Sequence, residues 1–412
     1  MKYLLKKRHF SLVLLVLLLL VVVFFTCAKR SENADGAGAG ARGLGVDGDT
    51  VVSTYIRTWR LEAEDQREES PHWDAGMVKA EYLTDLIIAF ALINSDDKHT
   101  IYISEERFSF KNLWNEVAAL KSTHPNLRVN ISIGGYTGSA HFSDMVKDEN
   151  IRAQFVAGVI DWLDRHNLDG VDIDWEYPVG PPWGVRVFAD AQNYLALLRD
   201  LRDAMDTLGA KTGKYYSLST AVPSSSWFAA AINVKEVANI VDALKLMAYD
   251  YYGGWSPTTG HNSNIYRNPN DSSNGGSTDQ GLRSYLTAFV PPNKIQMGVA
   301  FYGRAFAGVQ PGPNGDGLYQ KYTSIPFSNG YLTWAQIKEL LEPDSGFTRY
   351  WDDVAKAPYL YNGDIWITYT DQQQIEELVK FSKEKGLGGF FSWEYGTDIN
   401  GDLLKALFEN AQ

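Results

Sequence analysis

One short segment of the sequence carries acidic side chains at a spacing that could do chemistry. Residues 168–178 read LDGVDIDWEYP and include acids at Asp172, Asp174 and Glu176. Side chains of a strand alternate between its two faces, so the three acids share one face and the apolar residues between them share the other. The segment therefore predicts a strand whose carboxylates face the inside of the fold while its apolar side packs against helices.

A buried row of three carboxylates indicates proton transfer. Like charges in a partly desolvated site cannot all ionise, so such a row is kept where its members share a proton. Glu176 is nearest the carboxyl end of the predicted strand, and Asp174 should raise its pKa, with Asp172 acting through Asp174. We therefore predict that Glu176 donates a proton near neutral pH.

A purely structural interpretation is that basic partners or a bound cation neutralise the row. Basic residues at inward positions of the candidate strands are few, and the main ones are Lys245 and Arg304. This scarcity disfavours the structural interpretation. Asp169 has the opposite strand parity and begins the strand, so we assign it to turn formation.

The elements that must position these acids alternate along the chain. Runs rich in β-branched, apolar or aromatic residues are separated mostly by segments with helical periodicity. The candidate strands are 51–59, 85–93, 129–134, 170–176, 215–222, 243–249, 295–302 and 389–393. Eight such alternations predict an α/β fold of the (β/α)8 TIM barrel type, in which catalytic groups lie at the carboxyl ends of the strands. An open doubly wound sheet is the alternative.

The interval between the seventh and eighth candidate strands is too long for a plain barrel. It has roughly 85 residues, more than one helix and two loops require. Its central part is rich in aromatic residues, namely Trp334, Tyr350, Trp351, Tyr359, Tyr361 and Trp366. We predict a catalytic barrel over 51–412 that contains a small inserted α+β subdomain at 305–369.

The first 50 residues predict export. A basic start is followed by an apolar run at 11–25, which resembles the two parts of a signal peptide and is short for a membrane span. Cys27, the single cysteine, comes directly after the run, so residues 1–27 are a signal peptide or a lipoprotein signal with Cys27 as the lipidation candidate. Residues 28–50 predict a flexible linker. We expect an exported protein, secreted or anchored to the cell surface through its N-terminus, without an internal disulfide.

Charge and composition exclude some partners. The formal net charge of the chain is -12, and nucleic-acid binding depends on clustered Lys and Arg. The seven histidines show no metal-ligand spacing, so we assign no metal and no cofactor. We expect the chain to act as a monomer.

The acidic segment is similar to the signature D-x-x-D-x-D-x-E of the family 18 glycoside hydrolases, the chitinases. Three further segments agree in order and placement: SIGG at 132–135, MAYD at 247–250 and FSWE at 391–394. The segment WDDVAKAPYLY at 351–361 resembles the inserted subdomain of the deep-groove members. The resemblance covers nearly all of 51–412.

This resemblance implies a chitinase that cleaves β-1,4-linked N-acetylglucosamine polymers with retention of configuration, by a substrate-assisted route. It implies that Glu176 protonates the leaving oxygen while the acetamido group of the sugar attacks its own C1 to form an oxazolinium ion. Asp174 would then hold the acetamido N–H, with Asp172 sharing its proton. Tyr249 would donate to the acetamido carbonyl, and Asp250 would contact the same sugar.

The resemblance also implies a hydrophobic floor for that sugar at Trp393. Further expected substrate-binding residues are Met247, Arg304, Phe90, Tyr302, Gly134, Gly135 and Tyr136. Core packing is the alternative for Met247, Phe90 and Tyr302, and an ion pair with an acid is the alternative for Arg304. Tyr136 stands where relatives often carry Trp, which weakens one expected sugar contact. Candidate platforms along the groove are Trp183, Trp227, Trp255 and Trp334, and buried structure is the equal alternative for each of them.

Two other functions remain open at this point. A related hydrolase could act on peptidoglycan glycans or on chito-oligosaccharides only, because the same acetamido chemistry serves both. A chitin-binding lectin also occurs on this scaffold when the acid is replaced. The presence of Glu176, Asp174 and Tyr249 favours the enzyme.

Overall fold

The computed structural model of the chain describes residues 50–59, 75–95, 100–103, 113–182, 184–273, 275–327 and 329–412. The expected signal at 1–27, with its Cys27, and the expected linker up to position 49 lie outside these ranges, as does Trp183. Across the described ranges, none of the helices combines the length and apolarity needed to span a bilayer.

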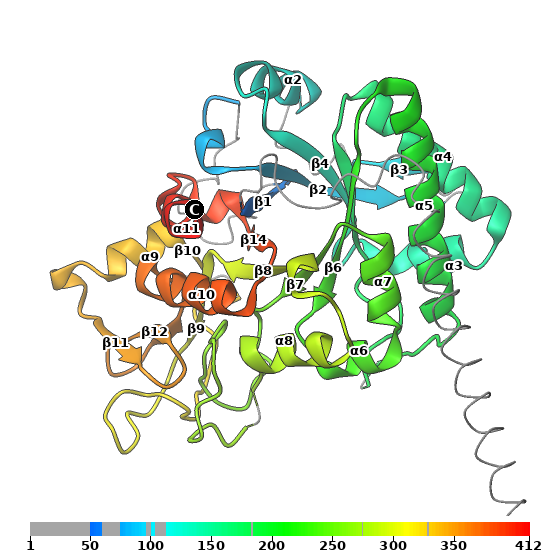
Figure 1. Ribbon diagram of the computed structural model, residues 1–412. Coiled ribbons are helices and arrows are strands. Elements are labelled where there is room, and N and C mark those ends of the chain that lie inside the picture. Colours follow the sequence, from blue (N-terminus) through cyan, green and yellow to red (C-terminus); the bar gives the residue numbers. More distant parts are fainter. Residues whose placement is uncertain are drawn as a thin grey trace, which may run out of the picture. The chain divides into compact units, whose positions relative to one another are not determined.

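Eight parallel strands of the described chain close into a barrel (Figure 1). Their bounds are β1 Val51–Arg57, β2 Asp85–Ile93, β4 Arg128–Gly134, β5 Gly170–Asp174, β6 Ser217–Pro223, β7 Ala243–Met247, β8 Ile295–Ala300 and β14 Gly389–Trp393. The strand order is β1-β14-β8-β7-β6-β5-β4-β2, and pairing of β1 with β2 closes the ring. The predicted TIM barrel is confirmed, and the open doubly wound sheet is wrong.

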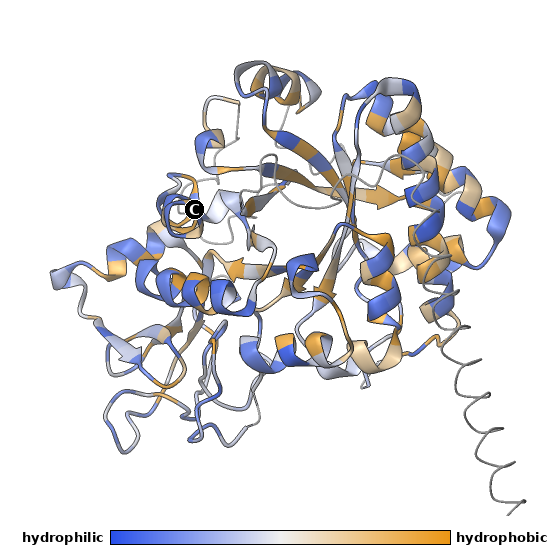
Figure 2. Cartoon of the chain, in the orientation of Figure 1, coloured by the Kyte–Doolittle hydropathy of each residue, from blue (hydrophilic) through white to orange (hydrophobic). Residues whose placement is uncertain are grey.

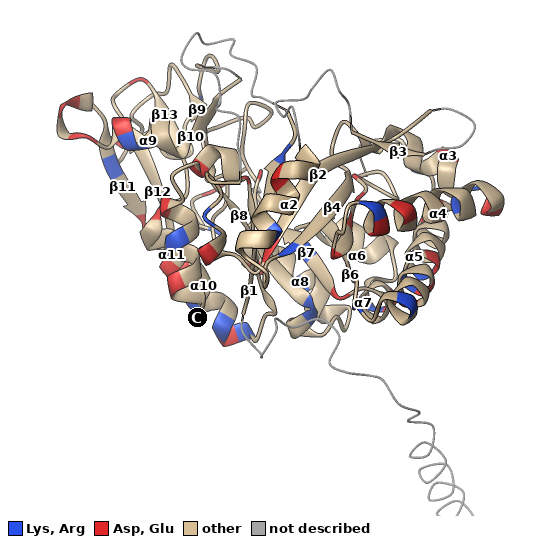
Figure 3. Ribbon diagram, turned by 90° about the horizontal axis from the view of Figure 1, so that it is seen from above, with Lys and Arg blue, Asp and Glu red and all other residues tan. Residues whose placement is uncertain are grey.

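Helices cover the outside of the barrel. Their bounds are α2 Leu113–Thr123, α3 Phe142–Val146, α4 Glu149–Arg165, α5 Asp190–Thr212, α6 Ser226–Ala231, α7 Val234–Ile240, α8 Thr278–Thr287, α10 Gln372–Lys385 and α11 Asp402–Ala411. Short 3-10 turns lie at Ala80–Tyr82, Ser139–His141, Pro292–Lys294, Pro343–Ser345 and Tyr395–Asp398, and β3, Ile101–Tyr102, pairs with β2. Hydrophobic residues follow the strands and the inner helix faces, while charged residues lie mostly on the outer helices and loops (Figures 2 and 3).

The period-two pattern of β5 explains how the barrel is filled. Val171 and Ile173 point outward and are almost completely buried against the helices, whereas Asp172 and Asp174 point inward. The barrel interior at this level is therefore polar, and the large apolar core lies between strands and helices. Asp169, before the strand, accepts hydrogen bonds from Lys121 and from the Val129 N–H.

A second sheet lies beside the barrel and is antiparallel. Its described strands, in spatial order, are β10 Tyr331–Thr333, β9 Tyr302–Phe306, β13 Trp366–Thr368, β12 Ala357–Tyr361 and β11 Thr348–Asp352, with α9 Trp334–Leu340 next to them. This sheet starts at Tyr302 rather than at the expected position 305. The reason is that β8 ends at Ala300, and the chain then leaves the barrel ladder to pair with β10 and β13.

The small sheet has an aromatic core of its own. Buried residues of this core are Phe306, Val309, Tyr359, Tyr361 and Trp366, together with Tyr252. Tyr252 belongs to the long connection between β7 and α8, not to the insertion. The connection and the inserted sheet therefore pack as one unit.

Candidate active site

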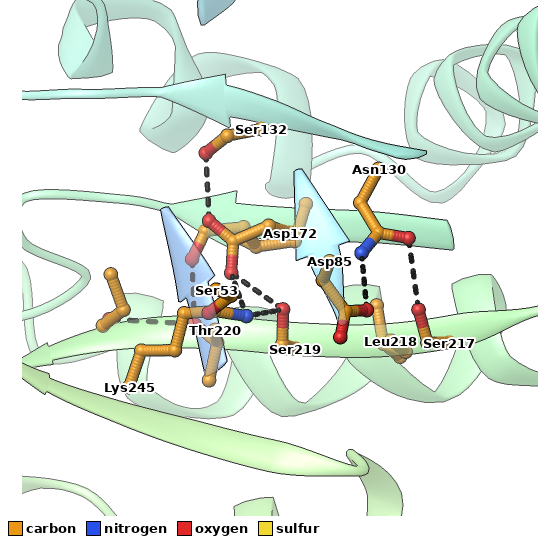
Figure 4. Close-up of polar contacts among 12 residues, drawn as sticks. Ser53, Asp85, Asn130, Ser132, Asp172, Ser217, Leu218, Ser219, Thr220 and Lys245 are labelled. Atoms are coloured by element: carbon orange, nitrogen blue, oxygen red, sulfur yellow. Dashed lines mark hydrogen bonds and ion pairs between the residues drawn. The ribbon is translucent and has the colours of Figure 1, made fainter. Parts of the chain in front are cut away.

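Asp172 is the deepest acid of the row and is fully buried. In the sheet register it lies opposite Ser132 of β4 and Ser219 of β6. It accepts hydrogen bonds from the hydroxyls of Tyr55 at 2.7 Å, Ser132 at 2.7 Å and Ser219 at 2.6 Å. Lys245 Nζ lies 3.4 Å from its Oδ1, and this contact is one of the dashed lines in Figure 4. The structural interpretation, a salt-bridged acid, thus describes this one member of the row.

Asp174 lies one pleat nearer the mouth of the barrel and is differently surrounded. Burial raises its pKa well above the usual range, and repulsion from Glu176 and Asp172 adds to this, while Lys245 opposes it. Its Oδ1 is buried and has no hydrogen-bond partner among the described residues. A buried oxygen without a donor is costly, so this atom is positioned to accept a hydrogen bond from a ligand.

Glu176 lies just beyond the end of β5, which corrects the predicted strand 170–176. Its N–H donates to Ser139 Oγ at 2.8 Å, which fixes the backbone outside the ladder. The pKa of Glu176 is raised to about 7, chiefly by burial and further by Asp250, while a hydrogen bond from Tyr177 opposes the shift. Burial is thus the largest cause for Glu176, and the expected repulsion from Asp174 is mutual, because it also raises the pKa of Asp174.

Aromatic side chains enclose the mouth of the barrel above the acids. A cluster built on Tyr55, Ile87, Ala89 and Phe391 is covered by Phe90, Met247, Tyr249 and Trp393. The ring of Trp393 stacks on Phe90 with centroids 5.6 Å apart and planes 15° apart. Tyr249 packs edge-on against Phe391 at 6.2 Å. The expected floor and the expected hydroxyl donor therefore border the same cluster.

Asp250 joins the end of β7 to the inserted sheet. Its Oδ1 accepts from the Tyr302 hydroxyl at 2.8 Å and from Arg304 Nη2 at 2.8 Å. Both partners belong to β9, the first strand of the insertion. Arg304 also lies over the ring of Trp255, 5.1 Å from its centroid. Arg304 thus forms the ion pair that was the alternative to a sugar contact, and its partner Asp250 is one of the predicted site residues.

The sequence of this chain matches the family model for glycosyl hydrolases family 18 over residues 51–398. The match covers most of the chain and includes every acid of the site. The chain belongs to family 18 of the glycosyl hydrolases. The resemblance carried by the acidic signature is therefore confirmed.

Known family 18 proteins are similar in sequence and in fold. Chitinase A1 of Niallia circulans is 36% identical over 307 residues, which are 71% of this chain and 44% of that protein. A cell-surface-expressed multi-modular chitinase of Paenibacillus sp. str. FPU-7 has a TM-score of 0.76 at 32% identity, over 88% of this chain and 42% of that one. An N-acetylglucosaminidase of Paenibacillus barengoltzii has a TM-score of 0.74 at 31% identity, over 88% and 100%. The chain spans less than half the length of the first two.

Close packing around the acids leaves room only for glycine at positions 134 and 135 of this family 18 chain. Gly134 has a φ of 116°, and a Cβ there would lie 2.2 Å from the carbonyl oxygen of Asp174. Gly135 has a φ of 82°, and its Cβ would lie 2.5 Å from the Phe90 ring. The pair therefore lets β4 approach β5 and Phe90. Tyr136, the next residue, is 79% exposed at the rim.

The candidate platforms of the groove differ in exposure. Trp255 is 62% exposed and therefore remains a candidate platform. Trp334 is only 3% exposed, so its assignment as a platform is wrong. The indole N–H of Trp334 donates to Asp402, and its ring belongs to the main core. Trp227 packs edge-on against Tyr177, the residue that follows Glu176, with ring centroids 5.2 Å apart.

Two aromatic residues of the family 18 site were missed by the sequence analysis. Tyr55 binds Asp172, and Trp59 stacks on Phe90 with centroids 5.8 Å apart. Both have the inward parity of the first strand, so the alternation applied to β5 would have found them. Within the described ranges, non-proline cis peptide bonds follow Ala89, Glu176 and Trp393. No sequence pattern distinguishes these bonds.

Proposed function

We propose that this family 18 chain is a chitinase. It would hydrolyse β-1,4-linked N-acetylglucosamine polymers with retention, using the acetamido group of the substrate as nucleophile. The observation that carries the proposal is the unpartnered, buried Oδ1 of Asp174 next to a Glu176 whose pKa is about 7. A group of that pKa can donate a proton and later accept one at neutral pH.

The first half of the reaction uses both acids. Glu176 gives its proton to the glycosidic oxygen, and the C1–O bond breaks with its electron pair leaving on that oxygen. The acetamido carbonyl oxygen attacks C1 from the other face and forms the oxazolinium ion. Asp174 accepts the acetamido N–H at its Oδ1, and its negative charge balances the cation.

The second half returns the enzyme to its starting state. Glu176, now a carboxylate, takes a proton from water while the water oxygen attacks C1 and opens the oxazolinium ring. Two displacements at C1 restore its configuration. Burial raises the pKa of Tyr249 far above its usual value, so its hydroxyl stays protonated and can donate to the acetamido oxygen. Trp393 supports the C–H face of the same sugar.

Thiazoline analogues of N-acetylglucosamine oligomers test the nucleophile. They imitate the oxazolinium ion, so we expect competitive inhibition well below roughly millimolar concentration. Fully deacetylated oligomers are the matched control, because they lack the acetamido group and should not be cleaved. Absence of inhibition up to that concentration, with the protein active, would contradict the substrate-assisted route.

A narrower substrate range is the second candidate function. It is favoured by the likeness to the Paenibacillus barengoltzii protein, whose name describes an N-acetylglucosaminidase. Peptidoglycan glycans offer the same acetamido chemistry.

The inserted sheet supports a deep groove and cleavage at or near a chain end, because its Arg304 reaches Asp250 in the site. The lengths of the products from soluble oligomers of defined length, with crystalline chitin and peptidoglycan tested beside them, distinguish these substrates.

We further propose that the chain is exported and held at the cell surface by a lipid on Cys27. The support is the order of basic start, apolar run and cysteine. Expressed in a bacterial host fed labelled palmitate, the full chain should carry label and sediment with membranes, whereas Cys27→Ser should lose both properties. Unlabelled protein in the medium would instead indicate plain cleavage of the signal. Protein retained in the cytoplasm would contradict export.

A further inference from the structure

A lysine side chain lies inside the barrel, where the mechanism above gives it no role. Lys245 of β7 is 4% exposed. Its Nζ lies 3.4 Å from Asp172 Oδ1 and donates to Ser219 Oγ at 2.5 Å, so it reaches across β6 to β5, as Figure 4 shows. Burying an ammonium is costly unless it is paired. Its position beneath the reacting acids therefore calls for a functional explanation.

The surroundings of Lys245 show which acids balance its positive charge. Titratable groups that face this part of the barrel are Asp172 and Asp174 of β5, Glu176 after it, Asp85 of β2, Tyr55 of β1, Tyr249 after β7 and Tyr194 of α5. Asp85 already has a cation of its own, because Arg128 binds it through Nε at 2.8 Å and Nη2 at 2.6 Å. The charge of Lys245 is therefore opposed mainly by the acid row.

Two opposite charges thus lie directly below Asp174. Asp172 raises the pKa of Asp174, and Lys245 lowers it. Neither charge can be screened by bulk water, because both side chains are buried. Lys245 therefore offsets part of the negative charge that Asp172 presents to Asp174.

We propose that Lys245 is a positioning residue that offsets the charge of Asp172 and thereby sets the pH range in which the Asp174–Glu176 pair holds a single proton. This role presupposes the chitinase activity proposed above. With one proton on the pair, Glu176 can act as acid while Asp174 is ionised. The acidic limb of the rate profile marks entry of a second proton, and the alkaline limb marks loss of the only one.

The sign of each charge change follows from electrostatics. Removing the positive charge of Lys245 makes both carboxylates harder to form, so both limbs move to higher pH. Removing the negative charge of Asp172 makes them easier to form, so both limbs move to lower pH. Removing both charges makes the two shifts oppose each other, so the limbs lie between those of the single variants.

Rate profiles of four variants on soluble chito-oligosaccharides test this role. We expect Lys245→Met and Lys245→Gln each to move both limbs up by about one pH unit, since neither carries a charge. Asp172→Asn should move them down. The double variant Asp172→Asn with Lys245→Met should place them between those of the two single variants.

The outcomes separate the two proposals. Limbs unmoved in both Lys245 variants, whatever the loss of rate or stability, would overturn the role of Lys245. Where a lone Lys245 variant does not fold, the double variant replaces it, because it buries no unpaired charge, and its limbs must lie above those of Asp172→Asn. A wild-type chain without hydrolysis would refute the activity instead. Infrared spectroscopy can follow the protonation of the buried carboxyls without turnover. In that case the pH at which these carboxyls titrate would still have to be higher in Lys245→Met than in the wild type.

Discussion

Glu176→Gln should lower kcat on N-acetylglucosamine oligomers by about a thousandfold, within the range that a general acid contributes. Gln has nearly the same shape but can neither give a proton to the leaving oxygen nor take one from water. Oligosaccharide affinity should stay within a few-fold of the wild type, because Trp393, Tyr249 and Asp174 are untouched. Initial rates and calorimetric titration measure the two quantities separately.

The matched control is Glu376→Gln, on the exposed face of α10, which makes the same chemical change away from the barrel mouth. It should leave both rate and affinity unchanged. A Glu176→Gln protein that keeps more than about a tenth of its activity would mean that another group supplies the proton. A wild type that binds oligomers without cleaving them would instead be a lectin.

Asp174→Asn should have the second largest effect and should also change the shape of the pH profile. The neutral amide cannot balance the oxazolinium charge, so we expect kcat to fall roughly a hundredfold. Burial and its neighbours hold the pKa of Asp174 well above the usual range, so its protonation contributes the acidic limb. With Asn this titration is lost, and the acidic limb moves to lower pH or disappears while the alkaline limb of Glu176 remains.

Asp169→Asn is the control for this prediction. It makes the same change in the same segment, but Asp169 binds Lys121 and the Val129 N–H outside the acid row. It should lower the free energy of unfolding and leave both limbs in place. An acidic limb that stays where it is in Asp174→Asn would show that the two site acids titrate independently.

The alternation of side chains along β5 predicted part of the site and failed to predict the rest. It was sufficient to send Asp172 and Asp174 inward, because side-chain direction in a strand is a local property. It did not predict where the strand ends, because β5 stops at Asp174 and the N–H of Glu176 donates to Ser139 Oγ beyond the ladder. It also did not predict that burial is the largest cause of the raised pKa of Glu176, since burial depends on the aromatic residues that other strands bring to the mouth.

Other features depended on contacts that no local pattern contains. Lys245 was recognised as a possible partner for the row, but its pairing with Asp172 depends on the reach of its side chain. The register places Lys245 opposite Ala221, two residues beyond the Ser219 that lies opposite Asp172, and Nζ reaches back to Ser219 and Asp172. Sequence alone left Trp334 as either a groove platform or a buried residue, and only the packing of α9 against the main core shows that it is buried. The start of the insertion at Tyr302 was hidden because β8 and β9 are separated by a single residue.

The shared aromatic core that contains Tyr252 has a practical consequence for redesign. The inserted sheet is not a removable cassette: cutting it out would expose Tyr252 and strip Asp250 of both its β9 partners. Attempts to open the groove for bulkier glycans should therefore replace side chains on the sheet surface and leave its framework intact.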